Sequence, residues 1–190
     1  MKKLKLVLLD RDGVINFDSP DYILSPDQWQ PIPGSLEAIA LLKDAGLFVA
    51  ICSNQSGLGR GMMSQDMFEA IQNKMVAATQ TAGGSFDVIS YCPHNPEAGC
   101  DCRKPKAGLL LQVLRELGVN PDEAVMVGDS LRDVQAAIAA GVSAVLVSSG
   151  YGDAQSIWQK AQALQPGIKM YDNLASYVET LLLKNFGEGA

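Results

Sequence analysis

The stretch KLVLLDRDG, residues 5–13, contains an apolar segment followed by an acidic turn, and it indicates the fold class of this chain. Its apolar run, Lys5–Leu9, has the length and composition of a buried strand and stops at the acidic turn Asp10-Arg11-Asp12. Gly13 follows and permits a tight turn. The pattern predicts a short buried strand that carries two carboxylates at its carboxyl end.

Similar apolar runs alternate with amphipathic segments along the rest of the chain. Further strands are predicted at Leu47–Cys52, Phe86–Tyr91, Ala124–Val127, Ala144–Val147 and Ile168–Tyr171. Helices are predicted at Leu36–Ala45, over about eighteen residues from Ser64, and at Ala107–Leu117, Leu131–Ala140 and Leu174–Lys184, with residues 185–190 frayed. Ser35 is the expected N-cap of the first helix. Alternating strands and helices predict an α/β fold, a Rossmann-like parallel sheet with helices on both faces.

Polar residues follow several of the predicted strands. Asp10, Ser53, Cys92 and Asp129 each come just past the end of an apolar run. In a parallel sheet of this kind, ligands bind at the carboxyl ends of the strands. These four side chains are therefore expected at one rim. The 14–34 segment is long for a connecting loop and is expected to have a function there.

Length and composition limit the function classes. The 190 residues, 47% hydrophobic and 19% charged, are expected to form one globular domain, 1–190. No apolar run reaches the roughly eighteen residues of a membrane span, and the one after Met1–Lys5 is too short for a signal peptide. A net charge of −6 argues against nucleic acid as a partner. We therefore expect a cytoplasmic protein, with no nucleic acid and no membrane among its partners.

One short loop, residues 92–102, concentrates the soft metal ligands. It holds the chain's only histidine, His94, together with Cys92, Cys100 and Cys102 of its four cysteines. Three thiolates and one imidazole complete a tetrahedral zinc site and leave no position open for chemistry, which predicts a structural Zn²⁺. The alternative is a set of reduced buried cysteines beside a surface histidine.

The aspartates at the rim suggest a second, harder metal. Asp10 and Asp12 stand two residues apart, and such carboxylates repel each other unless a cation or a shared proton lies between them. Asp129 and Asp133, behind another predicted strand, add to that charge. Mg²⁺ prefers a few carboxylates, waters and a substrate phosphate. The alternative is that the first two aspartates only terminate a strand.

Four turns together resemble the haloacid dehalogenase superfamily of phosphohydrolases: DRDGV at 10–14, SNQS at 53–56, RKP at 103–105 and GDSLRD at 128–133. The resemblance implies that Asp10 is the nucleophile and Asp12 the general acid/base. It implies that Ser53 and Lys104 hold the phosphoryl group. It also implies a catalytic Mg²⁺ held by Asp10, Asp129 and the backbone carbonyl of Asp12.

No insertion is large enough to be a cap domain, and the zinc loop with RKP resembles the zinc-containing, cap-less branch of that superfamily. The branch includes phosphatases of histidinol phosphate and of heptose bisphosphate. The SNQSGLGRG stretch, residues 53–61, is most similar to the latter. This implies Mg²⁺-dependent hydrolysis of the C7 phosphate of D-glycero-D-manno-heptose 1,7-bisphosphate through an aspartyl-phosphate, a step of ADP-heptose and lipopolysaccharide core biosynthesis. The implied substrate contacts are Asp18, Ser19, Pro20, Asp21, Ser53, Asn54, Gln55, Ser56, Arg103 and Lys104.

Two alternatives stay open at the level of the sequence. One is a histidinol-phosphate phosphatase, and the other is a non-enzymatic phosphoacceptor domain of the receiver type. The expected partner is a small phosphorylated sugar, and the expected state is a monomer. The sequence leaves open whether Arg60 reaches the ligand, whether Ser130 does more than cap a helix, and whether Asp133 supports Lys104 or the metal.

Overall fold

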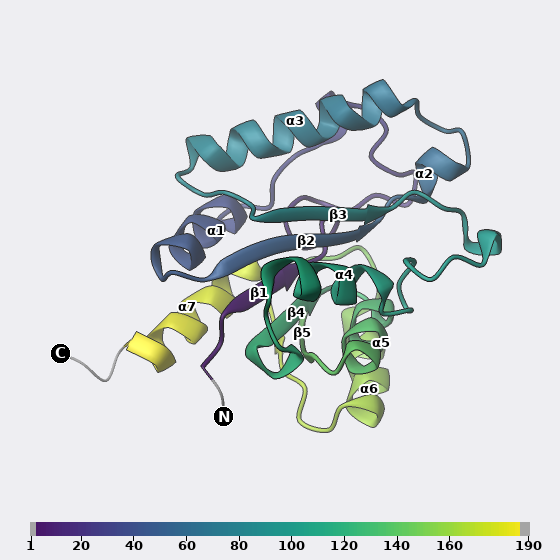
Figure 1. Ribbon diagram of the computed structural model, residues 1–190. Coiled ribbons are helices and arrows are strands. Elements are labelled where there is room, and N and C mark those ends of the chain that lie inside the picture. The colour runs from purple at the N-terminus through teal and green to yellow at the C-terminus, as the bar shows by residue number, and fades with distance from the viewer. Residues whose placement is uncertain (1–2, 187–190) are drawn as a thin grey trace.

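The computed structural model describes residues 3–186, which form a parallel six-stranded sheet (Figure 1). The strands are β1 (Leu6–Leu9), β2 (Phe48–Asn54), β3 (Val88–Cys92), β4 (Ala124–Gly128), β5 (Ser143–Val147) and β6 (Met170–Tyr171). Their spatial order is β3-β2-β1-β4-β5-β6, and every neighbouring pair is parallel. This is the doubly wound order, in which the direction of winding reverses beside β1. The predicted fold class is confirmed.

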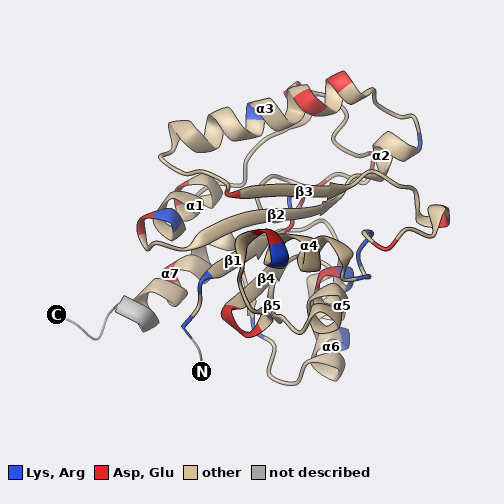
Figure 2. Cartoon of the chain, in the orientation of Figure 1, with Lys and Arg blue, Asp and Glu red and all other residues tan. Residues whose placement is uncertain are grey.

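Helices cover both faces of the sheet, and the strand residues alternate between them. Val7, Leu9 and their like-facing neighbours on β2 and β4 pack against α1 (Ser35–Asp44), α3 (Gln65–Thr81) and α7 (Leu174–Phe186). Leu6 and Leu8 pack on the opposite face, against α4 (Gly108–Leu117), α5 (Leu131–Ala140) and α6 (Ala154–Leu164). The strands carry no charged residue, so charge is confined to helices and loops (Figure 2). None of the described helices could cross a membrane.

Several predicted boundaries need correction. The N-cap of α1 is Gly34, not Ser35, because Ser35 turns inward and its hydroxyl donates to the Ile15 carbonyl at 2.6 Å. Strand β2 continues through Ser53 to Asn54, and Cys92 is the last residue of β3, so neither Ser53 nor Cys92 lies past its strand. The sequence reading missed α6 and the short α2 (Ser56–Gly59).

The chain's end was also misjudged in part. Helix α7 continues to Phe186, whereas the tail was expected to fray from residue 185. The remainder of that expected frayed tail, residues 187–190, lies outside the described residues. Three 3-10 turns, at Pro26–Gln28, Pro96–Ala98 and Pro121–Glu123, were not predicted either.

The 14–34 loop closes on itself beside the carboxyl end of β1. Its two ends pair through Phe17 N to Gln30 O and Ile32 N to Ile15 O, each at 3.0 Å. Trp29 inserts into the core and is 1% exposed. The remaining tip of the loop is therefore anchored next to the rim where the candidate site lies.

Candidate active site and metal-binding loop

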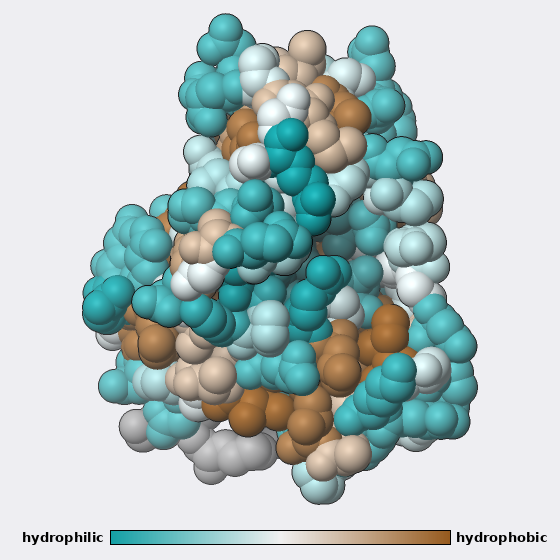
Figure 3. Space-filling view, turned by 90° about the vertical axis from the view of Figure 1, so that its right-hand side faces the viewer, coloured by the Kyte–Doolittle hydropathy of each residue, from teal (hydrophilic) through white to brown (hydrophobic). Residues whose placement is uncertain are grey.

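A polar cavity of about 250 Å³ opens at the carboxyl ends of the strands. Figure 3 views the molecule from this side and shows hydrophilic side chains around a hollow near the centre of the face. The walls come from the turn after β1, the 14–34 loop, the end of β2 and the residues after it, the Arg103-Lys104 segment that follows the zinc loop, the start of α5 and the loop after β5. Lining residues are Asp10, Arg11, Asp12, Asp18, Ser19, Pro20, Tyr22, Ile23, Asn54, Gln55, Ser56, Arg103, Lys104, Asp129, Ser130, Arg132, Asp133 and Tyr151.

A buried ammonium group lies between two carboxylates at the floor of this cavity. Lys104 Nζ is 2.8 Å from Asp10 Oδ2 and 2.5 Å from Asp133 Oδ1, and Lys104 is 1% exposed. Burial acts to lower the pKa of Lys104, but Asp10 and Asp133 outweigh it and the pKa is raised. Burial acts to raise the pKa of Asp133, and Lys104 overcomes it and lowers that pKa. Lys104 is therefore a permanent cation directly beside Asp10.

Asp10, Asp129 and Asp133 form a carboxylate cluster whose oxygens lie within 4.8 Å of one another. Burial raises the pKa of Asp10 to about 7, with Lys104 opposing and Asp133 reinforcing the shift. Burial, with Asp133 and Asp10 adding to it, raises the pKa of Asp129 to about 8. Crowded, buried oxygen ligands of one charge fit a hard divalent cation. Asp10 and Asp129 are the more accessible pair, since both are only partly buried, whereas Asp133 is 1% exposed and is bonded to Lys104 and to Ser130 N and Oγ.

Asp12 is not part of that carboxylate cluster and is held by several donors. Arg11 Nε donates to its Oδ1 and Arg11 Nη2 to its Oδ2, both at 3.0 Å. Asn16 Nδ2 donates at 2.8 Å and Gln55 Nε2 at 2.9 Å. The two aspartates of the DRD turn thus occupy different surroundings, one beside a lysine and one among neutral amides and a guanidinium. This difference suits them to different chemical tasks.

The structure brings most of the implied substrate contacts to the cavity, although not all. Asp18, Ser19 and Pro20 line it, whereas Asp21 lines a neighbouring hollow. Ser53 is buried, 2% exposed, and accepts a hydrogen bond from Gln55. Asn54, Gln55, Ser56, Arg103 and Lys104 all line the cavity.

The three residues left open by the sequence also have definite places. Arg60 is exposed and does not line the cavity. Ser130 is the N-cap of α5. Asp133 pairs with Lys104, so it supports the lysine.

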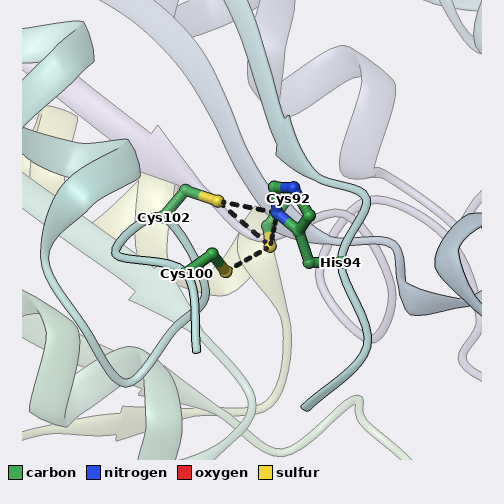
Figure 4. Close-up of side chains that lie close together, drawn as sticks. All are labelled: Cys92, His94, Cys100 and Cys102. Atoms are coloured by element: carbon green, nitrogen blue, oxygen red, sulfur yellow. Dashed lines mark hydrogen bonds between the residues drawn. The ribbon is translucent and has the colours of Figure 1, made fainter. Parts of the chain in front are cut away.

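The zinc loop brings its four ligand atoms together (Figure 4). Cys92 Sγ lies 3.3 Å from Cys102 Sγ and 3.6 Å from Cys100 Sγ, and His94 Nδ1 lies 3.3 Å from Cys102 Sγ. Zn–S bonds of about 2.3 Å in a tetrahedron place ligand atoms about 3.8 Å apart, so the set fits zinc. The alternative was a set of reduced buried cysteines beside a surface histidine. His94 is exposed, but its Nδ1 is directed at the thiols of Cys92 and Cys102, and Cys100 and Cys102 are only partly buried.

The zinc loop leads directly into the backbone of Lys104. Arg103 Nη1 donates to the His94 carbonyl at 3.3 Å, across the loop. Lys104 N and O each bond to the side-chain amide of Asn54 at 3.0 Å. The peptide that presents Lys104 is therefore fixed from two sides, by the zinc loop and by Asn54 at the end of β2.

Sequence reasoning missed a glycine cradle around Asp129. A Cβ placed on Gly13 would lie 2.4 Å from Asp129 Oδ2, and one on Gly150 would lie 1.9 Å from it. Ser149 Oγ also donates to Gly13 O at 2.7 Å, which joins the loop after β5 to the DRD turn. The SSGYG stretch, residues 148–152, was the available signal, but nothing in the sequence shows which carboxylate it meets. Tyr22, Arg132 and Tyr151, which also line the cavity, were likewise missed.

Fold and site together define a hydrolase of the Rossmann-like α/β class, with paired aspartates and a buried lysine at the carboxyl ends of a parallel sheet. The chain belongs to the haloacid dehalogenase-like hydrolase family, whose model matches residues 4–141. It is 44% identical over 177 residues to the D-glycero-beta-D-manno-heptose-1,7-bisphosphate 7-phosphatase of Pseudomonas aeruginosa, covering 93% of this chain and 97% of that protein. The phosphatase of the same name from Bordetella bronchiseptica is 44% identical over 179 residues, 94% of this chain and 98% of that one. The crystal structure of D,D-heptose 1,7-bisphosphate phosphatase from B. bronchiseptica complexed with magnesium and phosphate matches with a TM-score of 0.89 at 42% identity, covering 95% of this chain and 99% of that chain.

Proposed function

We propose that this protein hydrolyses the C7 phosphate of D-glycero-β-D-manno-heptose 1,7-bisphosphate. The observation that carries the proposal is the similarity, over nearly the whole chain, to phosphatases named for that reaction. The cavity supports it, because a small polar pocket with Lys104 at its floor and Arg103 in its wall suits a phosphorylated sugar. We further propose that residues 1–190 act as one domain and as a monomer.

Asp10 is the proposed nucleophile. Its Oδ1 accepts from Arg11 N at 2.7 Å and its Oδ2 lies beside Lys104, so the carboxylate is held in one orientation. A carboxylate oxygen attacks phosphorus, the P–O7 bond breaks, and an aspartyl-phosphate forms. Water then attacks this phosphorus and releases inorganic phosphate with Asp10 restored. Positioning and charge neutralisation are the main requirements of such a phosphoryl transfer.

Asp12 is the proposed general acid and base. As the P–O7 bond breaks, Asp12 gives its proton to the departing sugar oxygen, and it later takes a proton from the attacking water. The donors around its carboxylate hold it apart from the carboxylate cluster of Asp10. One residue can then serve both half-reactions.

The metals are assigned to different tasks. Asp10, Asp129 and the backbone carbonyl of Asp12 are the proposed Mg²⁺ ligands, and Mg²⁺ supplies positive charge for the phosphoryl oxygens. Cys92, His94, Cys100 and Cys102 are the proposed ligands of a structural Zn²⁺.

Lys104 and Ser53 are the proposed contacts to the phosphoryl group, and Arg103 and the Asp18–Asp21 stretch are the proposed contacts to the rest of the substrate. A carboxylate-bearing loop can bind sugar hydroxyls through charge-assisted hydrogen bonds.

The test compares phosphate release from heptose 1,7-bisphosphate and from histidinol phosphate, each with Mg²⁺ present and with it withheld. We expect a higher kcat/KM for the heptose and almost no turnover without Mg²⁺. A higher kcat/KM for histidinol phosphate would assign the chain to the rival phosphatase. A long-lived phosphorylated Asp10 without release from either substrate would identify a phosphoacceptor domain.

A further inference from the structure

The two amide side chains after Ser53 are already occupied by protein groups. Asn54 Oδ1 accepts from Lys104 N, and Asn54 Nδ2 donates to Lys104 O. Gln55 Nε2 donates to Asp12 Oδ2 at 2.9 Å and to Ser53 Oγ at 2.8 Å. Although both residues line the cavity, their amides are directed at the groups that are proposed to do the chemistry.

Gln55 has no amide hydrogen left for a substrate. A glutamine nitrogen carries two hydrogens, and Asp12 and Ser53 take one each. The nitrogen of Gln55, and not its oxygen, faces both Asp12 Oδ2 and Ser53 Oγ, so both of its hydrogens are directed at oxygen acceptors of the protein. The side chain is 5% exposed, which limits its freedom to turn toward the cavity.

This arrangement also fixes the direction in which the Ser53 hydroxyl donates. Its oxygen accepts from Gln55, so its single hydrogen points elsewhere. Among the described residues, Ser53 Oγ donates to no protein group. A hydroxyl oriented in this way is prepared to donate to a phosphoryl oxygen, with no reorientation needed during the reaction.

We propose that Gln55 is a positioning residue that links the Ser53 hydroxyl on β2 to the Asp12 carboxylate after β1, and that it makes no contact with the sugar. The proposal rests on the phosphatase activity proposed above. It assigns to Gln55 the tasks of keeping Ser53 a donor toward the phosphoryl group and of holding Asp12 in place for proton transfer.

Two substitutions of similar size separate these tasks from simple packing. Gln55→Met keeps the length of the side chain and removes both hydrogen bonds, and it should lower kcat by about 10- to 100-fold, the range for hydrogen bonds to charged or reacting groups. Gln55→Glu should lower kcat further, by about 10²- to 10³-fold, since a carboxylate repels Asp12 and accepts the Ser53 hydrogen. KM should stay within about twofold of wild type in both, because interactions made only in the transition state change kcat.

The measurement uses two substrates on the full chain with Mg²⁺ and Zn²⁺ present. One is heptose 1,7-bisphosphate, and the other is p-nitrophenyl phosphate or another monoester without a sugar that the wild type hydrolyses. A positioning role predicts the same fold loss of kcat on both. Gln112→Glu, on the exposed side of α4, is the charge-matched control and should behave as wild type.

A rise in KM on the heptose substrate alone would overturn the proposal, because it would show a contact with the sugar. Wild-type kcat in Gln55→Met on both substrates would overturn it as well. Thermal unfolding confirms that each variant is folded, and the isosteric Gln55→Glu carries the test if the methionine variant does not fold. Failure of the wild type on heptose bisphosphate would refute only the proposed function, since the sugar-free substrate still tests Gln55.

Discussion

The Gly150→Ala substitution tests whether the proposed magnesium ligand Asp129 depends on the loop after β5. The added Cβ would lie 1.9 Å from Asp129 Oδ2 and 2.6 Å from its Cγ. Ordinary contact begins at 3.4 Å, so the carboxylate or the loop must move by about 1.5 Å. Gly13 lies against the same carboxylate oxygen, since a Cβ on it would come within 2.4 Å of Asp129 Oδ2 and 3.0 Å of Gly150 Cα, so there is little free space between these glycines and Asp129.

A movement of that size is large for a metal ligand. Mg²⁺ binds oxygen at about 2.1 Å in nearly octahedral geometry and tolerates little distortion. A misplacement of about 1 Å at a reacting centre can cost on the order of 10²-fold in rate. We therefore expect kcat to fall by about 10²-fold at fixed Mg²⁺, and the Mg²⁺ concentration for half-maximal activity to rise.

The assay is the rate of phosphate release as a function of Mg²⁺ concentration, with circular dichroism to confirm folding. Gly152→Ala is the matched control two residues along the same loop. Its added Cβ would meet only Ile157 Cδ1, at 2.9 Å, and the end of a flexible side chain can move aside. That variant should stay near wild type. A folded Gly150→Ala enzyme with wild-type kcat and Mg²⁺ dependence would refute the reasoning.

Other parts of the site lead to further predictions. Asp10→Asn should abolish turnover and leave the fold intact, as measured by phosphate release and thermal unfolding. Cys102→Ser, or removal of zinc, should lower turnover in the presence of Mg²⁺, because the zinc loop leads directly into Lys104; metal analysis and kcat check this. In metal-free protein, burial raises the pKa of Asp10 to about 7 and of Asp129 to about 8, against 3.8 for a free aspartate. The folded state then holds these protons more tightly than the unfolded chain, so the Tm should fall as the pH rises from about 4 to about 8, and Mg²⁺ should stabilise most at the upper end. Lys74 Nζ, on α3, donates to the carbonyls of Pro26 and Trp29 at 2.6 and 2.9 Å and so anchors the 14–34 loop. Lys74→Met should lower the free energy of unfolding by about 2 kcal/mol in urea titration. It should also raise KM, because the same loop carries the proposed substrate contacts Asp18–Asp21.

Each of these has an outcome that would contradict it. Substantial kcat in folded Asp10→Asn would remove it as nucleophile. Full activity in verified zinc-free protein would show that the Asn54 amide alone suffices to hold Lys104. A Tm that rises between pH 4 and pH 8 without metal would show that folding does not raise the pKa values of Asp10 and Asp129. An unchanged KM in Lys74→Met would show that the bonds from Lys74 to the 14–34 loop have no effect on substrate binding.

The strands, most of the helices and the Cys/His cluster followed from local patterns in the sequence. The apolar runs of β1, β2 and β4 are buried on both faces, so they are hydrophobic without interruption and easy to detect. The zinc ligands are confined to one loop, 92–102, and their chemistry is specific enough to identify them without a fold. Helix α6 was missed although its apolar residues recur with helical spacing; Ile157 and Trp158 are only partly buried, and Ala161 is its one buried residue.

The tertiary structure alone decided which polar groups meet. Asp133 lies 29 residues from Lys104 in the chain. The fold holds the Lys104 backbone on Asn54 at the end of β2 and its ammonium beside Asp10 after β1, and only this placement brings the ammonium to 2.5 Å from the Asp133 carboxylate. Family resemblance implied that Asn54 and Gln55 contact the substrate. The fold bonds the Asn54 amide to the Lys104 backbone and the Gln55 amide to Asp12 and Ser53. The need for glycine at position 150 likewise comes from a residue elsewhere in the fold, because Gly150 follows β5 and packs against Asp129, which follows β4. A sequence records each residue's own preference, whereas a hydrogen bond or a steric clash depends on the partner, and the doubly wound sheet selects those partners from distant segments.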